Sequence, residues 1–96
     1  MSYYVYIIFS ETINRYYVGV AQDLTTRIQN HNSSFYRGSH YTKQADDWVL
    51  FHFISCSSYQ QAIKIEKYIK KMKSRIYIQN LKKYPEIVEK LKTICT

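Results

Sequence analysis

The chain begins with an unbroken apolar run, YYVYIIF, at residues 3–9. Every residue of this run is aromatic or β-branched, which is typical of a strand. No polar residue alternates with the apolar ones, so we expect the strand to be buried on both faces. A second strand is predicted at residues 15–20, and the intervening SETIN is short enough for a hairpin. The start of the chain therefore predicts a hairpin whose first strand lies inside the fold.

Helix and strand signals alternate after the hairpin. Asp23 is placed to cap a helix that runs to His31. The polar residues 32–47 predict a surface loop, and the apolar residues 48–55 predict a third strand. The first half of the chain thus supplies three strands and one helix.

A long helix is predicted from Ser57 or Ser58 to about Ser74. Its apolar residues are spaced by three and four positions, which predicts one stripe that faces the sheet. These residues are Ala62, Ile65, Ile69, Met72 and Ile76. Residues 74–83 continue this helix as a second helical piece, and a last short helix starts at Pro85.

The resulting order, β-β-α-β-α-α, predicts an α+β fold in which helices flank a small three-stranded sheet, antiparallel or mixed. A chain of 96 residues has no room for a second core. We therefore expect one domain over residues 1–96.

Basic residues are concentrated in the second half of the chain. Fourteen Lys and Arg face seven Asp and Glu, which gives a net charge of +7, and ten of the fourteen lie between Lys64 and Lys92. Such a surface suits a polyanion such as DNA or RNA, although a solvated helix surface explains the same composition. Lys64, Lys67 and Lys71 share one helical face, so we expect them to bind nucleic acid.

Two features indicate the compartment. Cys56 and Cys95 form no CxxC pair and have no histidine partners at zinc spacing. The first apolar run is too short to span a membrane and lacks the features of a signal peptide. We therefore expect a reduced, cytoplasmic protein that does not bind membranes, and nothing in the sequence indicates a protein partner.

The predicted hairpin brings two tyrosines together. If Phe9 lies opposite Asn14 across a four-residue loop, then Tyr6 lies opposite Tyr17 on the same face of the sheet. Gly19 shares that face, and its missing side chain lets another backbone or a ligand approach closely. An aromatic pair that only packs would explain the same pattern.

Three further polar residues are candidates for chemistry. Arg27 and His31 share a helical face at i,i+4 spacing, where they can bind a phosphate and move a proton, or form an ordinary exposed face. Glu66 is the only acid between Asp47 and Glu86. It can pair with Lys70, or it can hold a hydrated Mg²⁺, which often takes one or two carboxylates plus water and phosphate.

In their order along the chain, these residues resemble the GIY-YIG endonuclease superfamily. VYI at residues 5–7 and YVG at residues 17–19 stand at its two strand motifs, although Val5 replaces the first glycine. IEKYIKKMKSR resembles the long helix that carries the metal-binding glutamate, here Glu66, and Ile65 replaces a basic residue often found before it. HYTK at residues 40–43 and Trp48 resemble small stand-alone bacterial members. The resemblance extends to the N-terminal nuclease domain of the excinuclease UvrC and to phage homing endonuclease catalytic domains.

The resemblance implies a metal-dependent DNA endonuclease with a single Mg²⁺ or Mn²⁺ on Glu66. It places Tyr6 and Tyr17 beside the attacking water, where one of them, or His31, helps to remove a proton, while Arg27 holds the phosphate. It implies that the two tyrosine hydroxyls, Arg27 and Glu66 surround one concave patch. Gly19 would leave room for the substrate backbone. Weaker matches are His40, Lys43 and Asn80.

Two alternatives remain open. A nucleic-acid-binding module of the same fold, with weak or no catalysis, would keep the basic surface. A structural domain that contacts an acidic protein would show no salt-sensitive binding to DNA.

Overall fold

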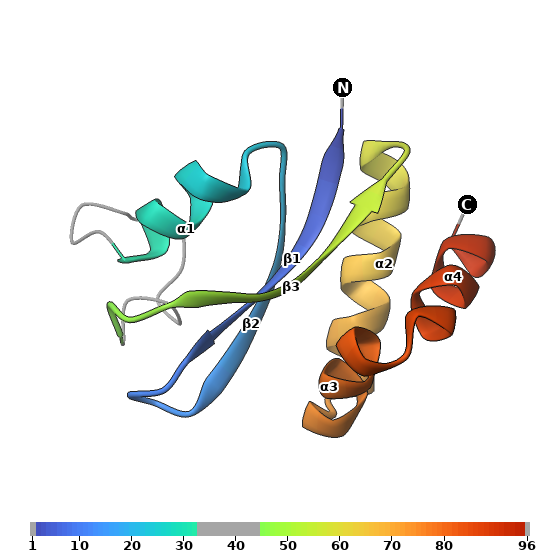
Figure 1. Ribbon diagram of the computed structural model, residues 1–96. Helices are drawn as coiled ribbons and strands as arrows, with labels where there is room; N and C mark the ends of the chain where they lie inside the picture. Colours follow the sequence, from blue (N-terminus) through green and yellow to red (C-terminus); the bar gives the residue numbers. More distant parts are fainter. Residues whose placement is uncertain (1, 33–44, 96) are drawn as a thin grey trace.

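The computed structural model describes residues 2–32 and 45–95 and contains one three-stranded antiparallel sheet in the order β2-β1-β3. Helix α1 lies on one face of this sheet, and α2, α3 and α4 lie on the other (Figure 1). The predicted fold class is therefore confirmed. The elements are β1 (Tyr3–Ser10), β2 (Arg15–Ala21), α1 (Leu24–Asn32), β3 (Val49–Cys56), α2 (Tyr59–Met72), α3 (Arg75–Lys83) and α4 (Pro85–Ile94).

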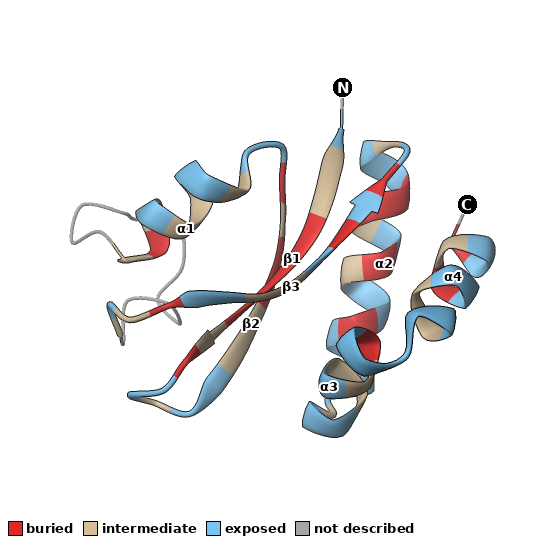
Figure 2. Ribbon diagram, viewed as in Figure 1, coloured by how far each residue is buried: buried red, intermediate tan, exposed pale blue. Residues whose placement is uncertain are grey.

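The central strand β1 is buried on both faces, as predicted, because helices cover both sides of the sheet. Val5 and Ile7 belong to the core beneath α2, whereas Tyr6 and Ile8 belong to a second core beneath α1. All four residues are at most 2% exposed. In Figure 2 this buried segment is the red part of β1, where the strands overlap in the view. The alternation of side chains along one strand thus serves two separate cores.

The predicted register of the hairpin is wrong by two residues. Tyr6 lies opposite Gly19, and Tyr17 lies opposite Ile8. The turn closes between Ser10 and Arg15, one position later on each strand than predicted. The reason is Asn14, whose φ of 53° is left-handed, a conformation that asparagine tolerates at turns. Because the shift is an even number of residues, Tyr6 and Tyr17 remain on one face, as diagonal neighbours.

The predicted helix starts are confirmed by their caps. The Asp23 carboxylate accepts a hydrogen bond from the Thr26 backbone N–H at 3.1 Å, and Ser58 Oγ accepts one from Gln61 N–H at 3.1 Å. Pro85 occupies the first turn of α4. Each cap satisfies a backbone donor that the helix leaves unpaired.

The predicted long helix ends earlier than expected, which adds a helix to the predicted order. Lys73 adopts a left-handed conformation with φ of 48°, so α2 stops at Met72, and Ser74 caps the separate helix α3. The last residues of the predicted apolar stripe are therefore not buried. Met72 is 44% exposed and Ile76 is 69% exposed, because the break turns α3 away from the direction of α2.

Two segments that flank residues 33–44 are tied together by a pair of hydrogen bonds. The Asn32 side-chain amide donates to the Trp48 carbonyl at 2.8 Å, and its oxygen accepts the Trp48 N–H at 2.7 Å. The end of α1 is thereby fixed to the start of β3. Within the described residues, no helix is both long and apolar enough to cross a membrane.

Candidate active site

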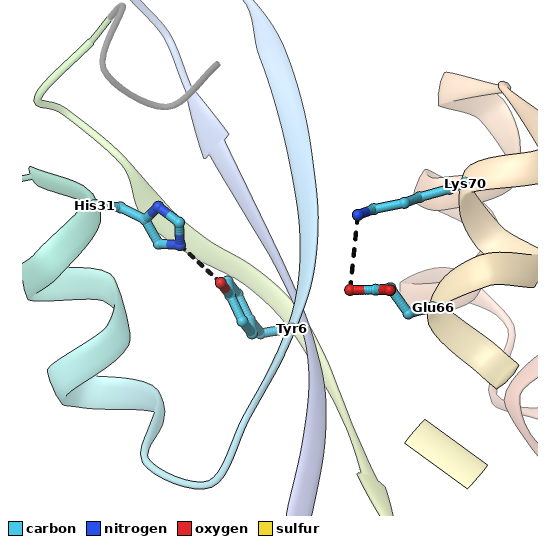
Figure 3. A network of polar contacts seen from close by, with 4 residues as sticks. All are labelled: Tyr6, His31, Glu66 and Lys70. Carbon is cyan, nitrogen blue, oxygen red and sulfur yellow. Dashed lines mark hydrogen bonds and ion pairs between the residues drawn. The ribbon is translucent and has the colours of Figure 1, made fainter. Parts of the chain in front are cut away.

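The first element of the site joins β1 to α1. The Tyr6 hydroxyl lies 2.7 Å from Nε2 of His31, at the end of α1 (Figure 3). Both side chains are 2% exposed. Tyr6 is therefore held inside the fold by His31 and is not open to solvent.

The His31 ring is neutral at pH 7. Burial, together with the positive charge of Arg27 one turn earlier on α1, lowers the pKa of His31 to about 4. A neutral imidazole has one donor and one acceptor nitrogen, so the tautomer of His31 decides whether the Tyr6 hydroxyl donates to Nε2 or accepts from it. Arg27 and His31 are thus close together, as their spacing predicted, and the charge of Arg27 contributes to the low pKa of His31.

Gly19 makes the position of Tyr6 possible. A Cβ added to Gly19 would lie 2.5 Å from the Tyr6 hydroxyl oxygen and 2.6 Å from Cζ. Real Cβ atoms do not approach other atoms so closely, and only glycine leaves room for the ring. The sequence predicted that substrate backbone approaches here, but the Tyr6 ring occupies this space.

Tyr17 is partly buried on the edge strand β2, where it lies close to residues from both sides of the sheet. Its ring centroid lies 5.0 Å from that of His31 and 6.3 Å from that of Tyr6. The ammonium of Lys70, on α2, lies 5.5 Å from the Tyr17 ring centroid. Tyr17 thus lies between the Tyr6–His31 pair and helix α2.

Glu66 lies on α2, one turn before Lys70. Its Oε2 is 3.6 Å from Lys70 Nζ, and its side chain is 18% exposed. This is the edge of the buried stripe, as predicted, and it is also the simple ion pair that the sequence left open. Figure 3 shows Glu66 and Lys70 on the side of the sheet opposite to Tyr6 and His31.

The expected single concave patch is therefore wrong for Tyr6. Its hydroxyl points towards His31 and away from Glu66 (Figure 3). The sheet lies between this hydroxyl and α2, and β2 is its edge strand on one side. Tyr17 occupies that edge, beside Lys70.

A cavity of about 530 Å³ lies next to Tyr17, between β2 and the junction of α2 and α3. Its lining includes four cationic side chains, namely Arg15, Lys70, Lys73 and Arg75. Arg15, Lys73 and Arg75 were not predicted from the sequence as residues of the site. Lys70 and Lys73 follow Glu66 at four and seven positions, so helical spacing alone would have placed them beside it.

Other predicted residues lie elsewhere. Lys64, Lys67 and Lys71 are exposed on α2 and do not line this cavity, because they point away from the sheet. Asn80 lies on α3 and does not line it either. His40 and Lys43 fall outside the described residues.

A comparison with protein families gives the class of this domain. Residues 2–84 match the GIY-YIG catalytic domain. Because the match covers most of the sequence, the chain belongs to the GIY-YIG family, as its two strand motifs predicted. Comparisons with curated proteins and with solved structures gave no match. A catalytic domain of this family implies a nuclease-type phosphodiesterase that acts on nucleic acid.

The family typically uses a divalent metal ion. Glu66 fits such an ion, because Mg²⁺ often takes a single carboxylate together with water and phosphate oxygens. Lys70 approaches one of its two carboxylate oxygens, Oε2. The donor set of the described residues is thus compatible with a metal that the substrate helps to hold.

Proposed function

We propose that this protein is a divalent-metal-dependent endonuclease that hydrolyses phosphodiester bonds of DNA. The observation that carries the proposal is the position of Tyr17, whose ring contacts His31 on one side and Lys70 on the other. This edge residue brings the tyrosine–histidine pair and the Glu66 helix to one place. Family membership supports the same reaction class.

In this proposal, Tyr17 is the tyrosine that faces the attacking water. Tyr6 is buried, and its hydroxyl is hydrogen-bonded to His31. This pair packs against the Tyr17 ring and thereby orients it. The Lys70 ammonium lies beside the Tyr17 ring. Tyr17 would first lose its phenolic proton to solvent, and the phenolate would then accept a proton from the attacking water as the water oxygen bonds to phosphorus. The P–O bond to the leaving strand breaks, and the leaving oxygen takes up a proton from solvent.

Arg27 and Glu66 act on the phosphate. Arg27 would bind a non-bridging oxygen, because a guanidinium stabilises the charge that develops there in the transition state. Glu66 would hold a single Mg²⁺ or Mn²⁺, which supplies polarisation of the phosphate when bound. Such an ion would compete with Lys70 for the Glu66 carboxylate.

A plasmid-nicking assay tests the proposal. The purified chain is incubated with supercoiled plasmid in Mg²⁺, Mn²⁺ or EDTA, beside Arg27→Ala, Glu66→Ala and the volume-conserving Ile69→Leu. We expect nicking with metal only, retention in Ile69→Leu and loss in both alanine variants. Nicking by a folded Glu66→Ala variant at the parent rate would overturn the metal role of Glu66.

A second function is a DNA-binding module with weak or no catalysis. The Glu66–Lys70 ion pair and the buried Tyr6 hydroxyl favour it, because both engage groups that a nuclease needs. Binding of DNA without nicking in either metal would identify this case. The finer likeness to UvrC or homing endonuclease domains, and the cytoplasmic location, are also proposals.

A further inference from the structure

The cavity beside Tyr17 has a strongly basic rim. Arg15 contributes from β2, Lys70 and Lys73 from the end of α2, and Arg75 from the start of α3. None of the residues that line the cavity, all of them within the described ranges, is acidic. Lys70 is paired with Glu66, which does not line the cavity, and the wall holds no carboxylate for Arg15, Lys73 or Arg75. This excess of positive charge indicates a ligand with negative charge.

The floor of the cavity is apolar. Val18 from β2, Ile69 from α2 and Ile78 from α3 line it together with the Tyr16 ring. A free inorganic anion has no use for such a floor, whereas a nucleotide unit has a charged phosphate and an apolar sugar face. The combination of rim and floor therefore favours the backbone of a nucleic acid strand over a small ion.

Arg75 is already held in position for an anion. One of its terminal nitrogens donates to the Asn14 carbonyl at 3.1 Å, and the other donates to Asn14 Oδ1 at 2.9 Å. The guanidinium also lies 5.4 Å from the centroid of the Tyr16 ring. Because a guanidinium has five N–H donors, donors remain for a phosphate after the two bonds to Asn14.

Lys73 carries a second, independent indication. Its backbone is left-handed, with φ of 48°, at the C-terminal cap of α2. Glycine is the favourable residue at such a cap, and a side chain there is energetically costly. Lys73 nevertheless lines the cavity. A costly residue at a cavity wall is expected where the side chain has a function.

We propose that this cavity binds a backbone phosphate and its sugar on the DNA strand next to the scissile phosphate. Tyr17 lines both the cavity and the catalytic cluster, so the two sites are directly adjacent. The proposal rests on DNA being the substrate, but it concerns binding and requires no cleavage.

The test compares two variants that lose the same charge. In the cavity variant, Arg15→Gln is combined with Lys73→Gly. In the control variant, Lys83→Gln is combined with Lys90→Gln, two exposed lysines on α3 and α4 that do not line the cavity. Binding to a fluorescein-labelled DNA duplex is measured by anisotropy in EDTA between 50 and 200 mM salt. Lys73→Gly alone serves as a second cavity variant, since glycine suits the left-handed cap and keeps the protein folded.

We expect the cavity variant to bind about 10-fold more weakly and its salt slope to be shallower by about 2, since each phosphate contact contributes about 0.9 to the slope. The control should keep the parent slope. Equal losses in both variants, or an unchanged slope in the cavity variant, would overturn the proposal. Plasmid nicking reports separately on catalysis. If the salt slope depends on the cavity residues but no nicking is seen, the binding site is supported and only the endonuclease activity is rejected.

Discussion

The Tyr6 hydroxyl lies 2.7 Å from Nε2 of His31, and both side chains are buried between β1 and α1. This contact turns a strand tyrosine and a helix histidine into one unit, 25 residues apart in the sequence. The same unit supports the Tyr17 ring at the edge of the sheet. The buried Tyr6–His31 pair thus determines where Tyr17 lies at the edge of the sheet.

The stability of the protein should fall between pH 6.5 and pH 4 because of His31. Burial and Arg27 lower the pKa of His31 from 6.5 to about 4 in the folded protein. In this interval the unfolded chain binds the extra proton and the folded chain does not, so acidification favours unfolding. We expect a loss of the order of 1–3 kcal/mol, measured by urea unfolding at pH 7, 6 and 5.

His31→Gln is the control for this pH dependence, because glutamine keeps an acceptor for Tyr6 and does not titrate. His52, whose pKa is also lowered by burial and by the charge of Lys82, still contributes in the variant. The variant should therefore retain a weaker dependence on pH. Equal slopes in the parent and the variant would show that His31 takes up its proton at the same pH in the folded and the unfolded protein.

Gly19→Ala should destabilise the protein by about 1–3 kcal/mol, because the new methyl group overlaps the Tyr6 ring. The measurement is urea unfolding of a double-mutant cycle that combines Gly19→Ala with Tyr6→Ala. Without the Tyr6 ring, the alanine at position 19 should cost little. An equal cost in both backgrounds would locate the strain in the backbone of β2.

Asn32→Ala should cost about 1–3 kcal/mol, since it leaves the backbone N–H and C=O of Trp48 without the amide that pairs them. Asn32→Asp keeps the acceptor for the Trp48 N–H and loses only the donor, so its cost should be smaller. Thermal unfolding of the two variants checks the order. The opposite order would mean that repulsion between the new carboxylate and the Trp48 carbonyl outweighs the retained bond to the Trp48 N–H.

Much of the fold could be predicted from the sequence because local signals agreed with burial. The continuous apolar run predicted a strand covered on both faces, and Asp23 and Ser58 marked helix starts. The register could not be predicted, because it depends on whether Asn14 or its neighbour takes the left-handed position of the turn. The break after Met72 has the same origin, since a lysine at a left-handed cap gives no sequence signal.

The candidate site was predictable in composition but not in arrangement. The spacing of Arg27 and His31 and the isolated position of Glu66 identified the residues. The side of the sheet on which each one lies depends on how helices pack on both faces, which spacing does not encode. For that reason the burial of Tyr6 and the basic cavity at Lys73 were found only in the structure.

Lys73→Gly should raise the free energy of unfolding by about 0.5–1 kcal/mol, because it relieves a left-handed side chain at the cap of α2. The same substitution removes a cation from the cavity and should weaken DNA binding. Thermal unfolding and anisotropy on the same sample measure both effects. If Lys73 had only a structural role, its replacement by glycine would not weaken DNA binding.

The last prediction separates stability from catalysis on one helix. Glu66 is partly exposed and pairs with a surface lysine, so Glu66→Ala should change stability by no more than about 0.5 kcal/mol. Ile69 is 1% exposed in the core beneath the sheet, and Ile69→Ala should cost about 2–5 kcal/mol.

Activity should follow the opposite order among folded variants. Glu66→Ala loses the carboxylate proposed to hold the metal, whereas Ile69→Leu keeps the volume of the core and an apolar side chain at the cavity. Urea unfolding and metal-dependent nicking are measured for the same set. Full nicking by a folded Glu66→Ala variant would make Glu66 a partner of Lys70 and nothing more, because a phosphodiesterase that depends on this carboxylate cannot lose it without losing rate.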